Sequence, residues 1–424
     1  MLFTATFIFC LFIGVPIFAT LGIPAVIELL RSPIPLVTLS QNLFTGVDQF
    51  PLLAIPCFIL AGGIMIRSEI TNEIIEVMNI LVGKIPGGLA VVTVFSCMFF
   101  AAISGSGPGT TAAIGSIMIP AMLRKGYQVD FAGAVSASGG ALGVIIPPSN
   151  PMIVYGVLAN VSIADLFIAG VVPGMLLGLA MIAVCLFTGI TKGYAADQEP
   201  FSIRRLLRAI NRGKFSIFMP FLILGGIYLG IFTPTEASVV AVLYALFVGF
   251  VVKRIFTFKA FWDSLSETSL ICGGLVLIMG TAMFFGRFLA LEQVPQKIAN
   301  IILSISKDPT ILLIVITLFL MAIGTFMETL STVIILTPIF LPILKILGIN
   351  PIHFGIIFVV TNEIGFLTPP LGVNLFVACG LTKRTLEQIS IKMIPFIIAI
   401  CITLLILIYF PKITLFLPEL MRGR

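Results

Sequence analysis

Charged residues are scarce in this sequence. Only 10% of its 424 residues are Asp, Glu, Lys or Arg, whereas 59% are hydrophobic. Ordinary soluble domains carry about 25% charged residues. The mean hydropathy of +1.20 requires a solvent other than water for the long apolar runs. The scarcity of charge therefore excludes a water-soluble globule.

Histidine is nearly absent, and cysteines at metal-ligand or disulfide spacing are missing. The single histidine argues against metal chemistry based on imidazole. The seven cysteines are odd in number, form no Cys-x-x-Cys pair and lie inside apolar segments. We interpret them as small buried hydrophobic residues rather than disulfides or metal ligands. An intramembrane enzyme would need such groups or paired acids at ligand spacing. We therefore expect no enzyme, no catalytic residue and no cofactor.

Long apolar runs are what the sequence does contain. A bilayer core about 30 Å thick is crossed by about 20 apolar residues of helix. Runs such as 312–323 and 395–410 do not alternate, as the strands of an outer-membrane barrel would. We predict an all-α polytopic membrane protein. The apolar N-terminus has no basic region and is interpreted as a first membrane segment, not a cleaved signal.

Basic residues divide the chain, because Lys and Arg collect in the short cytoplasmic loops of membrane proteins. The densest cluster lies mid-chain, and we interpret 191–214 as a basic cytoplasmic linker between a first half, 1–190, and a second half, 215–424. The cluster consists of Lys192, Arg204, Arg205, Arg208, Arg212 and Lys214.

The two halves match each other in their special residues. A constant offset of 222 residues places Pro120 on Pro342 and Gly133 on Gly355. The same offset places the paired prolines at 147–148 on those at 369–370. Such agreement indicates an internal duplication.

The charges also orient the two halves. If Lys84 and Arg124 are both cytoplasmic, the segment 85–124 enters and leaves on one side as a re-entrant hairpin. The equivalent hairpin, about 308–346, lies between Lys307 and Lys345. Keeping every basic cluster inside requires an odd number of crossings between the hairpins. The duplication is therefore predicted to be inverted, which is typical of secondary transporters with sites at the midplane.

Three breaks interrupt the apolar segments. One is the run 104–111, Ser-Gly-Ser-Gly-Pro-Gly-Thr-Thr, and the others are the paired prolines, which predict discontinuous helices over about 130–160 and 352–381. Proline frees carbonyls from helical hydrogen bonding, and such groups survive at membrane depth only where they are buried or line a wet cavity. Sodium, which prefers oxygen ligands, is a natural partner. The alternative is that these residues serve only packing and kinks.

Few charged residues fall at membrane depth, where they are usually functional. Glu328 lies on the second hairpin tip. We expect its carboxylate either to contact the substrate or to cap the hairpin's own N–H groups. For Glu363 we favour pairing with a neighbouring helix, and for Arg287 an interfacial anchor. His353 follows Pro351 near a helix start and is interpreted as a surface or capping residue.

Four motifs in this order closely resemble the large membrane subunit, the DctM type, of tripartite ATP-independent periplasmic (TRAP) transporters. The resemblance extends over nearly the whole chain. The motifs are Gly105-Ser-Gly-Pro108, Ile146-Pro-Pro-Ser-Asn-Pro151, Gly324-x-Phe-x-Glu328 and Gly365-x-x-Thr-Pro-Pro-x-Gly372.

The resemblance implies sodium-driven import of an organic acid anion across the bacterial inner membrane by an elevator mechanism. A periplasmic binding protein would deliver the substrate, and a small four-helix membrane subunit would complete the permease. We expect that subunit on a separate chain, because this sequence begins directly with the large subunit. Nucleic acid is not an expected partner. The alternative function is an uncoupled, channel-like pore or exporter for organic anions.

The resemblance also assigns candidate site residues, mostly through their carbonyls. An asparagine at position 150 resembles the sequences of the sialic-acid branch of the family, so sialic acid is the favoured substrate. C4-dicarboxylates and other carboxylates remain alternative substrates. Glu328 stands where the family usually has Asp, and its longer side chain leaves a direct contact open. Sodium site 1 would use Ser104, Ser106, Gly143, Ile146 and Pro147; sodium site 2 Gly324, Thr325, Gly365 and Thr368; and substrate Ser106, Ser149, Asn150 and Glu328.

Overall fold

The computed structural model describes residues 2–194, 202–294, 296–298, 306 and 308–421. All regular secondary structure in these ranges is helical. Seven of the helical stretches described are long and apolar enough to cross a membrane by length and composition. The prediction of an all-α polytopic membrane protein is therefore confirmed.

The first helices form an extended N-terminal region. Gly14, at a positive φ of 78°, and Pro16, which begins the next helix, separate the first two helices. The prolines at 33 and 35 fall in the turn before the third. The region comprises α1 (Leu2–Phe12), α2 (Ile17–Arg31), α3 (Val37–Val47), η1 (Phe50–Leu53), α4 (Ala54–Arg67) and α5 (Ile70–Val82).

A helical hairpin and a broken helix follow. Gly105 adopts a left-handed conformation with φ 58° and ends α6, which glycine does at little cost. Ser106 then caps α7 by accepting a hydrogen bond from Gly109 N at 3.3 Å. The helices are α6 (Gly88–Ser104), α7 (Gly107–Arg124), α8 (Val129–Ile145), α9 (Asn150–Ala159) and α10 (Ile163–Lys192).

The second half contains the same sequence of a hairpin, a broken helix and a long helix. Both breaks contain a cis peptide bond, Pro147–Pro148 and Pro369–Pro370. The helices are α11 (Ile203–Tyr228), α12 (Pro234–Leu246), η2 (Phe247–Lys253), α13 (Phe258–Leu291), α15 (Pro309–Gly324), α16 (Thr329–Leu347), α17 (Pro351–Phe366), α18 (Val373–Thr382), α19 (Leu386–Tyr409) and α20 (Lys412–Met421).

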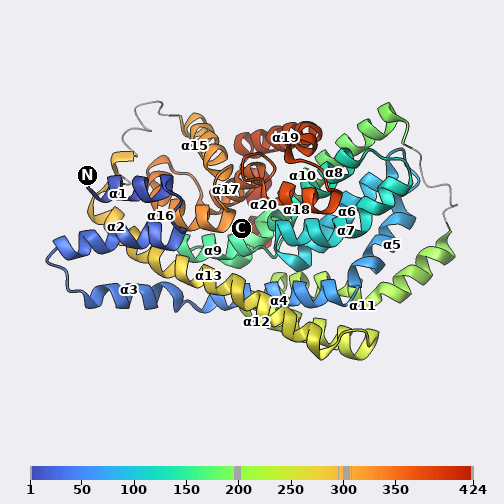
Figure 1. Cartoon of the computed structure of the whole chain (residues 1–424), viewed down its shortest axis with the longest axis horizontal. Coiled ribbons are helices and arrows are strands. Elements are labelled where there is room, and N and C mark those ends of the chain that lie inside the picture. The colour runs from blue at the N-terminus through green and yellow to red at the C-terminus, as the bar shows by residue number, and fades with distance from the viewer. Residues whose placement is uncertain (1, 195–201, 295, 299–305, 307, 422–424) are drawn as a thin grey trace.

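These helices form two groups, which Figure 1 shows one above the other. We call α2–α4 and α11–α13 the arm; there α13 packs along α2, α3 and α4, and α12 packs on α4. We call α6–α10 and α15–α19 the hairpin core. The core contacts the arm chiefly where α16 meets α13 and where α6 meets α4.

Inside the hairpin core, the second part of each broken helix packs on the opposite half of the chain. The helix α9 lies against α16 and α17, and α18 lies against α7 and α8. The Tyr155 hydroxyl donates to the Pro351 carbonyl at 2.7 Å, and Arg384 forms an ion pair with Asp130 at 3.1 Å. The two breaks are thereby held close to both hairpins.

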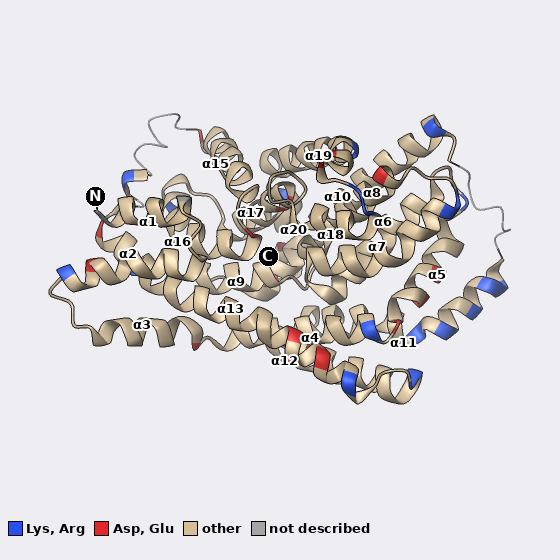
Figure 2. Cartoon of the chain, in the orientation of Figure 1, with Lys and Arg blue, Asp and Glu red and all other residues tan. Residues whose placement is uncertain are grey.

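Charged residues lie mainly at the ends of helices and along the start of α11, as Figure 2 shows. Residues 195–201 of the predicted linker, and Lys307, lie outside the described residues. Next to the arm, Glu73 of α5 accepts from Ser216 of α11 and forms an ion pair with Lys253 of η2. This network joins α5, α11 and η2.

His353 is buried, and the prediction of a surface or capping residue is wrong. Only 2% of its surface is exposed, and its Nδ1 lies 2.7 Å from Thr414 Oγ1. The reason is that α20 packs back onto α17, a contact between segments that local sequence does not indicate.

Candidate functional site

The first hairpin tip is a cluster of oxygen atoms. Ser104 Oγ lies 2.7 Å from Thr110 Oγ1, and the Thr110 hydroxyl is 2.8 Å from the Ser106 carbonyl oxygen. Gly143 of α8 lies directly beside them, because a Cβ at this position would be 2.4 Å from that carbonyl oxygen. Glycine is therefore required for the tip to close onto α8.

Ile146 and Pro147 follow the last turn of α8, next to this tip. Ile146 is half-buried and Pro147 buried. At the same break the Gly105 carbonyl accepts from Asn150 N at 3.5 Å, and a Cβ on Gly105 would lie 3.0 Å from the Pro148 carbonyl oxygen. The structure thus brings all residues of predicted sodium site 1 to one hairpin tip and one helix break.

The second hairpin tip closes in the same way. A Cβ on Gly365 of α17 would lie 2.4 Å from the Gly324 carbonyl oxygen. The Thr325 carbonyl accepts from Leu371 N at 3.0 Å. The Thr368 hydroxyl donates to the Ile364 carbonyl at 2.7 Å. The residues of predicted sodium site 2 therefore also meet at one tip and one break.

The residues predicted to contact substrate lie in different environments. Ser149 is fully buried and caps α9 by accepting from Met152 N at 3.4 Å. Asn150 is 4% exposed, and its Oδ1 has no hydrogen-bond partner in the described part of the chain. Glu328 is exposed and precedes α16 without a side-chain capping hydrogen bond. Its carboxylate is therefore available to a ligand.

Sequence reasoning missed Asn374. A Cβ on Gly107, the first residue of α7, would lie 3.0 Å from Asn374 Oδ1 and 3.4 Å from Glu363 Oε2. The second break therefore touches the first hairpin. The signal that could have found Asn374 is its place just after the Pro-Pro-x-Gly motif, where α18 begins.

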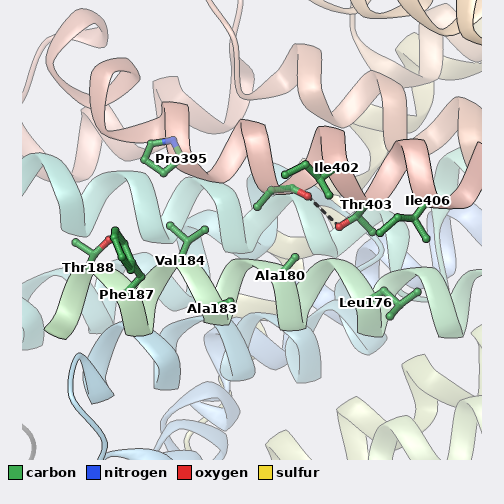
Figure 3. Close-up of a pocket in the computed structure, with 11 residues that line it drawn as sticks. Leu176, Ala180, Ala183, Val184, Phe187, Thr188, Pro395, Ile402, Thr403 and Ile406 are labelled. Atoms are coloured by element: carbon green, nitrogen blue, oxygen red, sulfur yellow. Dashed lines mark hydrogen bonds between the residues drawn. The ribbon is translucent and has the colours of Figure 1, made fainter. Parts of the chain in front are cut away.

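A separate apolar groove lies between α10 and α19. Figure 3 shows its lining, which is aliphatic except for Phe187 and two threonines. The Thr403 hydroxyl is occupied by a 2.9 Å hydrogen bond to the Ala399 carbonyl. Because its lining lies in the interior of two helices and offers an organic anion neither a cationic side chain nor a helix N-terminus, we exclude this groove as the substrate site.

The donor sets at the two tips are of the kind that hard cations prefer. Among the described residues there is no group of three or more His, Cys, Asp or Glu that could hold a metal. The tips offer carbonyl and hydroxyl oxygens, which suit hard cations rather than transition metals. The close glycine contacts bring these oxygens within a few ångströms of the helix breaks.

The comparisons with known proteins agree with this architecture. Residues 4–413 match the model of the tripartite ATP-independent periplasmic transporter, DctM component. The chain is 40% identical to the C4-dicarboxylate TRAP transporter large permease protein DctM of Pseudomonas aeruginosa, over 92% of this chain and 91% of that protein. It is 35% identical to the sialic acid TRAP transporter large permease protein SiaM of Vibrio cholerae, over 97% of each chain.

Two further matches concern length and fold. The chain is 42% identical to the isethionate TRAP transporter permease protein DctMQ of Oleidesulfovibrio alaskensis over 96% of this chain. It spans 64% of that relative's length. The solved YdaH transporter of Alcanivorax borkumensis shares the fold, with a TM-score of 0.68, 14% identity, and coverage of 97% of this chain and 98% of that chain. From the family model and these identities, the chain belongs to the DctM family of TRAP transporter large permeases, which are transporters rather than enzymes.

Proposed function

We propose that this permease imports an organic acid anion together with sodium ions. The observation that carries the proposal is the matched closure of the two hairpin tips: Gly143 and Gly365, separated by the 222-residue offset, each lie against a tip carbonyl oxygen. Paired tips beside unwound helices suit ions bound at the midplane of a transporter.

Each sodium ion would be held by oxygens of one tip and one break. At the first tip, the hydroxyls of Ser104 and Thr110 and the Ser106 carbonyl are the donors, and at the second tip the Gly324 and Thr325 carbonyls with the Thr368 hydroxyl. The ion's charge would compensate that of an anionic substrate in the low-dielectric membrane, where an uncompensated charge is costly.

The substrate is an organic acid, to which the N-terminus of α16, where no side chain caps the helix, offers backbone N–H groups. Asn150 and the exposed Glu328 would contact its hydroxyl or other polar groups. The relatives named for isethionate, C4-dicarboxylates and sialic acid support the class. Sialic acid, suggested by Asn150, is one of three acids to be compared directly.

The partners follow from the family. We propose that a small permease subunit packs against the arm in the bacterial inner membrane, and that a periplasmic protein delivers the substrate. The exposed apolar side chains along α3 and α13, such as Phe44 and Leu270, support burial of the arm by lipid or by that subunit.

The transport step would be a movement of the hairpin core against the arm. The halves would be inverted, with each hairpin re-entrant from its own side of the membrane. Support comes from the separation of the two groups of helices and from the exchange of α9 and α18 between halves. A rigid core that carries both sites could move as one unit, as an elevator requires.

Reconstitution tests the function. Proteoliposomes would contain this chain, its small subunit and a binding protein loaded with labelled isethionate, a C4-dicarboxylate or sialic acid. We expect uptake of one acid only with an inward sodium gradient, increased by an inside-negative potential because each charge moved gains about 2.3 kcal/mol per 100 mV. Equal uptake in sodium-free choline buffer would instead support an uncoupled pore.

A further inference from the structure

Glu363 is a buried carboxylate with an incomplete set of partners. It has no exposed surface, although it lies in the last turn of α17 beside the second break. Its Oε1 accepts from Thr329 Oγ1 at 3.1 Å, whereas Oε2 lies beside the Asn374 side chain without a well-formed hydrogen bond to any described residue. No ion pair found in the described ranges involves Glu363.

The neighbouring Asn374 is unsatisfied too. It is fully buried; its Oδ1 has no partner within the described chain, and its Nδ2 lies near the Glu363 carboxylate without a well-formed hydrogen bond. Both Asn374 Oδ1 and Glu363 Oε2 face Gly107, since a Cβ there would lie 3.0 Å and 3.4 Å from them. The absence of a side chain at position 107 leaves space between these oxygens and α7.

Four helices from both halves meet at this point. Gly107 begins α7, Thr329 begins α16, Asn374 lies in the first turn of α18, and Glu363 lies in the last turn of α17. A buried charge normally has a partner of opposite charge, and removing such a partner is strongly unfavourable. The groups at hand are oxygens of a carboxylate, a hydroxyl and an amide, which hard cations prefer.

We propose that Glu363, Thr329 and Asn374 form a third cation site, which binds one sodium ion between the two hairpins. The one carboxylate among these three ligands favours a monovalent ion, because one positive charge neutralises it. The site is distinct from the two tip sites, which consist of carbonyls and hydroxyls. It rests on the proposed function only in the identity of the ion.

The position of this site gives it a role in transport. An ion bound there would join the first residue of α16 to the last turn of α17 and the first turn of α18, beside the first residue of α7. Because the N-terminus of α16 is also where an anionic substrate would be held, the ion would lower the repulsion between Glu363 and that substrate. Sodium would therefore bind before the substrate.

The test is the number of sodium ions bound by the purified full-length chain. Equilibrium binding of radioactive sodium would be measured in detergent with choline chloride as the background salt. We expect three ions per wild-type chain and two for Glu363→Gln. The matched control Glu387→Gln removes an exposed carboxylate and should leave three. Equal numbers for wild type and Glu363→Gln would overturn the third site, because Glu363 would then be neutral without sodium.

A second variant guards against a folding defect in the first. Asn374→Asp adds a second carboxylate to the site and should create calcium binding that the wild type lacks, at one ion per chain. A variant that elutes as the wild type does from a sizing column, yet binds no calcium, would contradict the proposed ligands. If the wild type binds only two ions, the third site is contradicted but the proposed function is not. If the wild type binds no sodium, the proposed function is contradicted as well.

Discussion

Glycines on the broken helices control how closely each hairpin tip approaches the broken helix next to it. At Gly365 a Cβ would lie 2.2 Å from the Gly324 carbonyl carbon, and at Gly143 it would lie 2.4 Å from the Ser106 carbonyl oxygen. The atoms in the way belong to the backbone, so rotation of a side chain cannot relieve the contact. Any larger residue must push the tip away.

Gly365→Ala should therefore raise the sodium concentration for half-maximal uptake by at least about tenfold, since a loss of about 1.4 kcal/mol of ion binding corresponds to that factor. The matched control is Gly273→Ala on α13, where a Cβ meets nothing within 4 Å. Its sodium dependence should equal that of the wild type. Sodium titrations of uptake distinguish the two, and an unchanged Gly365→Ala would remove this tip from the ion site.

At the scale of elements, the network around Glu73 holds α5 against α11 and η2. Lys253 and Glu73 are largely buried, with side-chain exposures of 20% and 9%, whereas the neighbouring pair Arg212 and Glu76 is 70% and 39% exposed. Buried and exposed ion pairs respond very differently to the loss of one partner.

Glu73→Leu should lower the free energy of unfolding by about 3 kcal/mol, because it leaves the Lys253 ammonium without its partner. Glu76→Leu should change it by less than about 1 kcal/mol. Thermal denaturation followed by the loss of the monodisperse sizing-column peak compares them. Equal denaturation midpoints for the two variants would show that the buried ion pair does not stabilise the packing of α5 against α11 and η2.

How well the sequence predicts an element depends on whether the signal is local. Apolar runs and the Gly105 and Pro147 breaks are local, so helix type, membrane class and family could be read from them. The contact of His353 with Thr414 and the neighbourhood of Asn374 could not, because they join segments far apart in the chain. Of the breaks in the first 50 residues, one contains Gly14 and Pro16 and another contains prolines 33 and 35. These residue types alone do not distinguish a kink in one helix from a turn between two.

Site residues show the same distinction. The motifs bring Gly143 to the first tip and Gly365 to the second, as expected from a hairpin next to its own broken helix. The bond between Thr329 and Glu363 again joins a hairpin to its own break, but Gly107 meets Asn374 across the two halves. Only the packing of α18 on α7 brings the latter pair together.

At the scale of the whole molecule, movement of the hairpin core along the arm is the central claim. The contact between α13 and α16 lies on the boundary between the two groups. A Cβ on Gly286 would be 3.7 Å from Pro338 Cβ, close to the mean Cβ separation in disulfides of about 3.8 Å. Neither residue belongs to a proposed ion or substrate site, so a cross-link there would act on movement alone.

The measurement is uptake by Gly286→Cys/Pro338→Cys in a background with the seven native cysteines replaced. The control pair, Gly63→Cys/Ser264→Cys, has a Cβ separation of 3.8 Å and lies wholly within the arm, between α4 and α13. Oxidation should reduce uptake by the first pair to background, with recovery on reduction, and leave the control unaffected. Undiminished uptake by a fully cross-linked first pair would contradict a moving core.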